Sequence, residues 1–278
     1  MTARIFCLLL WCGWFLVMPL SAGNNEWTHT PPQWRNLSQG LIFAEVKVFH
    51  QEQEVETLAV VKVDPAFNSF RVFHREPKSI TAWQEELKAP VVFNASYYSP
   101  GHKPVGLVVS DGKLLGPLQN SRMRGMFVAE PKGMSPDLPR ATILDLVYGR
   151  IDPKNLPWTQ GVQSFPLLLD YKGRIRVKGT DKKSFRTVVC ADRNGNILIF
   201  NTGGDYFSLF DFARFLKVSA FEIDSALNLD GGREAQLYIK SKDFEYFSPP
   251  SWKNRLVTIL DQEQLLLPTV IGVFPRQE

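Results

Sequence analysis

The chain has little of what would assign a protein to a class by composition alone. Its 278 residues include 3 cysteines and 4 histidines, and no repeat or low-complexity tract occurs. The formal net charge is only +4, and no run of basic residues is present. So small and dispersed an excess gives no reason to expect a nucleic-acid partner. Hydrophobic residues at 44% and charged residues at 22% are typical of a folded protein, which excludes a disordered chain and a polytopic membrane protein.

The chain has too few cysteines to cross-link the fold with disulfides. Cys7 and Cys12 lie in an apolar N-terminal run, which leaves Cys190 alone in the rest of the chain. We therefore expect no intramolecular disulfide and a fold that relies on its core. Cys190 lies in an apolar, strand-like stretch and is interpreted as a small core residue. The histidines show no close metal-ligand spacing, so we expect no metal site; they are His29, His50, His74 and His102.

The N-terminus has the pattern of a targeting segment. Arg4 precedes an uncharged, mostly apolar run, Ile5–Leu20, and small residues follow at 21–23. This order predicts a secretory signal peptide over residues 1–23, cleaved near Ala22 or Gly23. The protein is then exported, to the periplasm or the extracellular space. The alternative is an uncleaved signal anchor, which would tie the chain to a membrane.

The rest of the chain predicts one α+β domain. Residues 24–40, with Pro31-Pro32, are interpreted as a loose lead-in, and residues 41–278 as the domain. Alternating or β-rich patterns predict strands over 41–49, 57–63 and 91–97, and apolar stripes predict helices over 78–88 and 209–217. We expect Ser79 and Ser208 to cap these helices, and Pro90 to end the first.

Three turn signals predict tight hairpins, at Asp111-Gly112, at 171–173 and at Asn194-Gly195. Asp-Gly and Asn-Gly supply the positive φ angles that two-residue hairpin turns require. Because strands outnumber helices and mostly connect by hairpins, we expect a largely antiparallel twisted sheet with helices packed on it, and not a doubly wound fold.

The most informative stretch for function is Ala226–Leu237. As a strand it sends Leu227 and Leu229 to one face, and Asn228 and Asp230 to the other. The glycines that follow, Gly231 and Gly232, allow backbone N–H groups to approach a ligand closely. The alternative is a hairpin turn with a solvated aspartate.

Two further segments place polar groups at the ends of apolar strands. Asn94 follows an apolar run, with Ser96 and Tyr98 expected on the same side, and a buried Asn must be hydrogen-bonded, to a ligand or to nearby backbone. Arg186-Thr187 begins another apolar strand. An arginine there either extends to the surface or binds an anion.

In this order, these segments resemble the phosphodiester glycosidase family, over about residues 85–240. The counterparts of the family's motifs are Asn94–Tyr98, Gly106 with Asp111-Gly112, Ser164–Leu168, Arg186-Thr187 with Asp192 and Gly195, and Asn228–Gly232 with Gln236. The chain departs from the family pattern at two places. Ala95-Ser96 stands where the family has Gly-Gly, and Arg233-Glu234-Ala235 stands where it has small residues.

The resemblance implies a hydrolase that cleaves the bond between a sugar's anomeric carbon and phosphate, in an envelope or extracellular glycan. Cleavage builds positive charge on the sugar and negative charge on the departing phosphate. It implies that Arg186 holds the phosphate, and that Asp230 acts as base, nucleophile or charge stabiliser, with no cofactor. The other implied site residues are Asn94, Glu234, Asn228, Gly231, Gly232, Ser96, Thr187 and Arg233.

Two alternatives stay open at this point. Arg233 and Glu234 are consistent with a non-catalytic exported domain that binds a glycan or cell-wall fragment in the same cleft. A purely structural envelope protein would bind no saturable ligand. The sequence leaves open the sugar, the stereochemical course and the oligomeric state.

Overall fold

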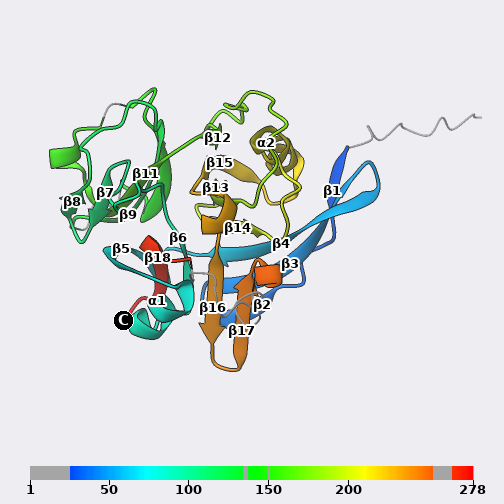
Figure 1. The fold of residues 1–278 in the computed structure, drawn as a ribbon, viewed down its shortest axis with the longest axis horizontal. Coiled ribbons are helices and arrows are strands. Elements are labelled where there is room, and N and C mark those ends of the chain that lie inside the picture. Colours follow the sequence, from blue (N-terminus) through cyan, green and yellow to red (C-terminus); the bar gives the residue numbers. More distant parts are fainter. Residues whose placement is uncertain (1–25, 134–136, 150, 253–264, 278) are drawn as a thin grey trace, which may run out of the picture.

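The computed structural model describes residues 26–133, 137–149, 151–252 and 265–277 (Figure 1). The predicted signal peptide, residues 1–23, lies outside these ranges, and so do Cys7 and Cys12. Within the described ranges, no helix combines the length and the apolarity needed to cross a membrane.

An eight-stranded sheet forms the largest layer. Its order is β1-β3-β4-β14-β13-β15-β12, with β2 paired to β3. The strands are β1 Trp27–His29, β2 Arg35–Ser38, β3 Leu41–His50, β4 Gln53–Val63, β12 Leu167–Leu169, β13 Thr187–Asp192, β14 Ile197–Thr202 and β15 Ile223–Asn228. The segment predicted as a loose lead-in, residues 24–40, contains two short strands, because β1 and β2 both pair with β3.

Two five-stranded sheets flank it. One has the order β10-β9-β11-β7-β8 and is green at the left of Figure 1; the other has the order β17-β16-β6-β18-β5. The strands of the first are β7 Val108–Ser110, β8 Lys113–Leu115, β9 Gly125–Pro131, β10 Ala141–Asp145 and β11 Trp158–Ser164. Those of the second are β5 Asn68–Lys78, β6 Val91–Asn94, β16 Leu237–Ser241, β17 Phe244–Ser248 and β18 Leu267–Pro275.

Helices contribute little to this fold. The described chain has α1 Ile80–Leu87, α2 Leu209–Val218 and two single turns, η1 Pro153–Asn155 and η2 Gly232–Glu234. Ser79 and Ser208 cap α1 and α2 as predicted, but α1 ends at Lys88 in the left-handed region before Pro90 is reached. Every strand pairing described is antiparallel, which confirms that prediction. The single sheet and the α+β class fit only loosely: the fold is predominantly β, in three sheets.

The hairpin predictions have mixed outcomes. Asp111 and Gly112, with φ of 47° and 78°, join β7 to β8 in the predicted two-residue turn. Between β13 and β14 only Gly195 has positive φ, and the loop is longer than two residues because Asp192 pairs with Asn196. The turn at 171–173 is followed by a single bridge, Leu169 to Ile175, and no second strand.

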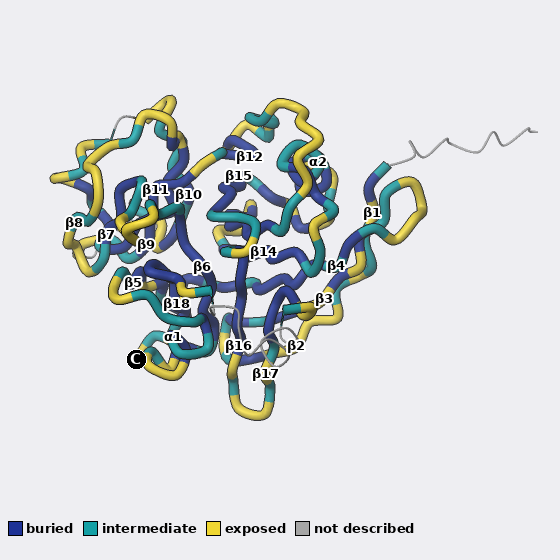
Figure 2. The backbone as a smooth tube through the Cα atoms, viewed as in Figure 1, coloured by how far each residue is buried: buried dark blue, intermediate teal, exposed yellow. Residues whose placement is uncertain are grey.

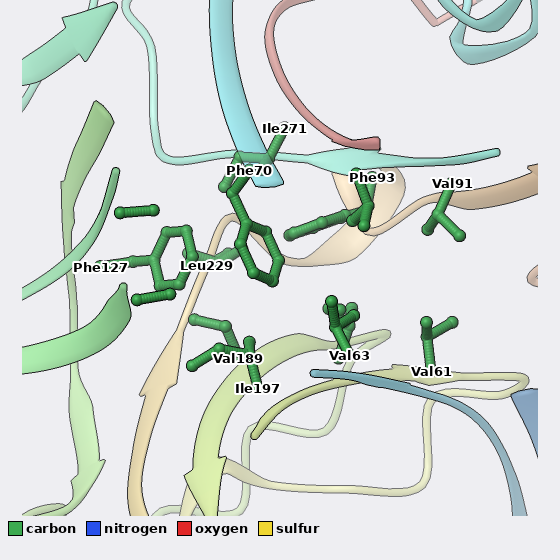
Figure 3. Close-up of a cluster of buried hydrophobic side chains, with 14 of the residues drawn as sticks. Val61, Val63, Phe70, Val91, Phe93, Phe127, Val189, Ile197, Leu229 and Ile271 are labelled. Atoms are coloured by element: carbon green, nitrogen blue, oxygen red, sulfur yellow. The ribbon is translucent and has the colours of Figure 1, made fainter. Parts of the chain in front are cut away.

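The main core lies where the three sheets meet (Figure 3). Phe70 and Phe93 come from one five-stranded sheet, Phe127 from the other, and Val189 from the eight-stranded sheet; all are fully buried. Figure 2 shows this buried centre along the inner strands. Cys190 points to the opposite face of its sheet, into a second cluster with α2, which confirms it as a core residue.

Candidate active site

Asp230 lies just beyond the end of β15, at the junction of two sheets. Leu229 anchors the preceding position in the core, and the Asp230 N–H donates to the carbonyl of Ala95, after β6, at 3.0 Å. The carboxylate accepts the Gly231 N–H at 2.9 Å. Burial, together with the nearby Glu234 carboxylate, raises the Asp230 pKa from 3.8 to about 7. At neutral pH this group is poised to exchange a proton.

Arg186 precedes β13 and is 6% exposed, so it does not extend to the surface. Its Nη2 donates to the Lys182 carbonyl at 2.9 Å and its Nε to the Phe207 carbonyl at 3.4 Å. Among the described residues it forms no ion pair, and burial lowers its pKa. A buried guanidinium held only by carbonyls retains an uncompensated charge, which favours an anionic ligand.

Gly231 brings Arg186 beside Asp230. A Cβ atom placed on Gly231 would lie 3.1 Å from the Phe185 carbonyl and 3.4 Å from Nη1 of Arg186. A side chain at this position would be tighter than usual against both groups, so glycine favours the close approach of the backbone after Asp230 to this arginine. The two glycine N–H groups, which the sequence suggested as donors to a ligand, have acceptors within the chain. The Gly231 N–H bonds Asp230, and the Gly232 N–H bonds the Phe185 carbonyl at 2.9 Å.

Two tyrosines that the sequence analysis left without a role border this pair. Burial raises the Tyr97 pKa, while the Asp230 carboxylate raises it further and Arg186 lowers it, so this phenol lies near both charges. Burial and the carboxylates of Glu234 and Asp230 raise the pKa of Tyr98 to about 12. Both phenols therefore stay protonated and can donate hydrogen bonds. Their position in the Asn94–Tyr98 motif was the sequence feature that could have indicated their place in the site.

Asn94 lies behind the site, not in it. The side chain is 1% exposed, and its Nδ2 donates to the Asp230 carbonyl at 2.8 Å. Its Oδ1 accepts the Thr187 hydroxyl at 2.6 Å and the Gln236 N–H at 3.1 Å. Asn201 donates in turn to the Thr187 hydroxyl at 2.8 Å. The predicted substrate contacts of Asn94 and Thr187 are thus replaced by contacts that hold the Asp230 loop.

Asn228 also has a supporting role. Its Nδ2 donates to the Tyr97 hydroxyl at 3.0 Å and to the Phe165 carbonyl at 3.1 Å. Its Oδ1 is buried without a hydrogen-bond partner, and so is the hydroxyl oxygen of Ser96. Oδ1 of Asn201, in the network behind the site, is also unpaired, and a bound ligand or water would satisfy such atoms.

The remaining predicted residues lie in η2. Glu234 is partly buried and close enough to Asp230 to raise its pKa, whereas Arg233 is exposed. The structure thus brings together Asp230, Arg186 and Glu234, with Tyr97 and Tyr98 between them. In the described part of the chain, no group of three or more acidic, histidine or cysteine side chains could hold a metal ion.

A family model for phosphodiester glycosidases matches residues 88–274, which include every residue of this site. The chain belongs to the phosphodiester glycosidase family. No curated protein sequence matches it significantly.

Solved structures share the fold at low sequence identity. The catalytic domain of zebrafish N-acetylglucosamine-1-phosphodiester α-N-acetylglucosaminidase, auto-inhibited by its pro-peptide, is 17% identical with a TM-score of 0.60, over 90% of this chain and 89% of that one. A hypothetical protein from Synechocystis is 17% identical with a TM-score of 0.55, over 88% and 64%. A Burkholderia pseudomallei protein, whose assigned name predicts export, is 10% identical with a TM-score of 0.52, over 83% and 77%.

Proposed function

We propose that the chain hydrolyses a sugar 1-phosphodiester, breaking the bond between the anomeric carbon and the phosphate oxygen. The observation that carries this is the position of Arg186, which is buried without a carboxylate partner among the described residues and lies against Gly231, the residue after Asp230, whose pKa is about 7. Family membership and the likeness to the zebrafish catalytic domain support it. The first substrate to test is therefore an α-N-acetylglucosamine 1-phosphodiester.

The two charges divide the work of bond cleavage. Arg186 pairs with the phosphate and stabilises the negative charge that the leaving oxygen gains. Phosphate is a good leaving group, so strong proton donation is less necessary than for an ordinary glycoside. The ionised Asp230 carboxylate faces the anomeric carbon, where it acts as nucleophile or activates water. Water supplies hydroxyl to the sugar and a proton to the carboxylate, and the phosphate monoester leaves with the bonding electrons.

Export is part of the proposal. The basic, apolar and small-residue segments of residues 1–23 support it, and so does the fold shared with the Burkholderia pseudomallei protein. The substrate would then be an envelope or extracellular glycan.

The deciding experiment compares two Asp→Asn variants on one substrate. We expect Asp230→Asn to keep the fold and to lower kcat/KM by about 100-fold or more, because it removes the charge that the chemistry needs. Asp111→Asn is the matched control. It lies in an exposed hairpin turn with φ of 47°, which Asn tolerates. Activity of Asp230→Asn within threefold of wild type would contradict the placement of the site.

A second candidate function is glycan binding without catalysis. It is suggested by the exposed Arg233, which stands where the family has a small residue. If the wild type binds but does not cleave phosphodiesters of several sugars, this second function replaces the first.

A further inference from the structure

A basic pocket adjoins the candidate active site, between residues of the β10-β9-β11 sheet and residues next to β12. Figure 1 shows β9, β11 and β12 in this part of the fold. A pocket of about 90 Å³ lies there, several times the roughly 10–15 Å³ that one water needs. Its lining residues are Arg122, Arg124, Asp145, Val147, Phe165, Pro166, Leu167 and Arg176.

The charge of this pocket is unbalanced. Asp145 is the only acidic residue in the lining, and it pairs with Arg176 at 2.9 Å. Asp170, which is buried behind the pocket, also pairs with Arg176, at 3.1 Å. Arg122 and Arg124 have no side-chain hydrogen bond or ion pair among the described residues. Two guanidinium groups thus remain uncompensated, and guanidinium forks match phosphate and carboxylate oxygens.

The backbone that carries these arginines is fixed. Met123, between them, is 3% exposed, and its carbonyl accepts the buried Gln163 Nε2 at 2.8 Å. The same Nε2 donates to the Asn120 carbonyl at 3.0 Å. With Met123 facing the core, Arg122 and Arg124 both project outward from a held segment. The backbone position of both arginines is thus fixed, while their exposed side chains are free to turn toward an anion.

The pocket and the candidate active site share a wall. Phe165 lines the pocket, and its ring packs on Tyr97 with centroids 5.0 Å apart. The Pro166 carbonyl accepts the Asn228 N–H at 3.0 Å. Asp230 is two residues beyond Asn228, so the shared wall is roughly 10 Å from Asp230 along this path. A ligand longer than one sugar phosphate can reach both.

Space continues beyond the arginines. An adjoining pocket of about 420 Å³ shares Asp145 and Leu167 with the first and is also lined by Tyr148 and Tyr171. This volume is in the usual range for ligand sites. Its lining includes Asp145, Asp170 and Asp224 and no basic residue, so it has room for uncharged sugars of an extended substrate and not for a further anionic group.

We propose that Arg122 and Arg124 bind a second anionic group on the aglycone side of the substrate, so that the preferred substrate is a glycan with more than one phosphate or carboxylate. This inference rests on the proposed function. It assigns the substrate class, since a diester with a neutral aglycone would leave both guanidinium groups unpaired.

The first test is the ratio of two kcat/KM values. N-acetylglucosamine-1-phosphoglycerol has a neutral aglycone, and the same compound with a terminal phosphate has an anionic one. We expect wild type to prefer the anionic substrate by about tenfold or more, mainly through KM, because guanidinium groups pair with phosphate oxygens in the bound state. Arg122→Ala with Arg124→Ala should bring the ratio near one. A wild-type ratio near one, or an unchanged ratio in the variant, overturns the proposal.

A charge-matched control separates the pocket from general electrostatics. Lys113→Ala with Lys132→Ala removes the same charge from exposed positions in the same sheet, at the far hairpin and beyond the opposite end of β9. We expect this variant to keep the wild-type ratio. If the ratio of the two kcat/KM values falls equally in both double variants, the preference comes from net charge, and the proposed role of the pocket is wrong.

Binding of inorganic phosphate tests the pocket without catalysis. In an Arg186→Gln background, calorimetry should detect saturable binding that Arg122→Ala with Arg124→Ala abolishes. Binding that persists in the triple variant, or no binding in the Arg186→Gln background, counts against the pocket. If neither diester is hydrolysed but phosphate binds as expected, the proposed function fails while the anion pocket stands.

Discussion

At the residue scale, the site depends on where a few charges are buried. Arg186 lies against Gly231, next to Asp230, and both charged groups have shifted pKa values: that of Asp230 is raised and that of Arg186 is lowered. Burial is the first cause of both shifts, and it acts against the charged form in each. A substrate phosphate would compensate the arginine. The residue types and their order predicted these two positions, but the support by Tyr97 and Asn94 depends on long-range contacts that one strand's pattern cannot reveal.

The pH profile provides a test at this scale. If Asp230 acts in its ionised form, kcat/KM should rise with pH through about 7, which is the pKa of Asp230 in the enzyme without substrate. Glu234 raises that pKa, so Glu234→Gln should move the rising limb to lower pH. The measurement is kcat/KM from pH 5 to 9 for wild type and variant. Glu245→Gln, in the exposed part of β17, is the matched control and should leave the limb in place. A limb that moves upward in Glu234→Gln would contradict this reading.

At the element scale, the site is built from strand ends. β6 ends at Asn94, β15 ends at Asn228, and β13 begins after Arg186. Apolar alternation predicted a strand at Ala226–Asn228, the second half of β15, and placed Leu227 and Leu229 on the core face, but it missed the first half of β15. It placed the end of β6 three residues too late, at residue 97, because the chain leaves the ladder after Asn94, where the Ala95 carbonyl accepts the Asp230 N–H and the Tyr97 carbonyl accepts the Val105 N–H. Turn chemistry predicted the Asp111-Gly112 hairpin, where both φ angles are local properties. It did not predict η2, whose position depends on Phe185.

A substitution at Gly231 tests whether activity depends on the close approach of these strand ends. Gly231→Ala adds a methyl group tighter than usual against the Phe185 carbonyl and Arg186 Nη1. We expect the neighbours to shift by tenths of an ångström and kcat/KM to fall about tenfold, because small misplacements at a reacting centre are costly. Gly101→Ala is the control, since an added Cβ there meets nothing within 4 Å. Equal activity of the two variants would show that the approach is not needed.

At the scale of the whole molecule, the site is where the sheets join. Asn94 belongs to the β17-β16-β6-β18-β5 sheet, whereas Thr187 and Asn201 belong to the eight-stranded sheet. Their hydrogen bonds cross the junction directly beneath Asp230. Sequence patterns predicted antiparallel strands but not their division into three sheets, because strand partners such as β6 and β18 are far apart in the chain.

This junction couples stability to activity. Asn94→Ala leaves the Thr187 hydroxyl and the Gln236 N–H without their buried acceptor. Because each unsatisfied group costs about 1–3 kcal/mol, we expect the free energy of unfolding to fall by about 3 kcal/mol. Asn36→Ala, exposed on β2, should change it by less than about 0.5 kcal/mol. Denaturant unfolding gives both free energies. The kcat/KM of Asn94→Ala, measured at a temperature well below its Tm, shows whether the Asp230 loop has shifted. If Asn94→Ala unfolds like wild type, the buried network does not hold the sheets together. If it is destabilised yet fully active, the network supports the fold without positioning Asp230.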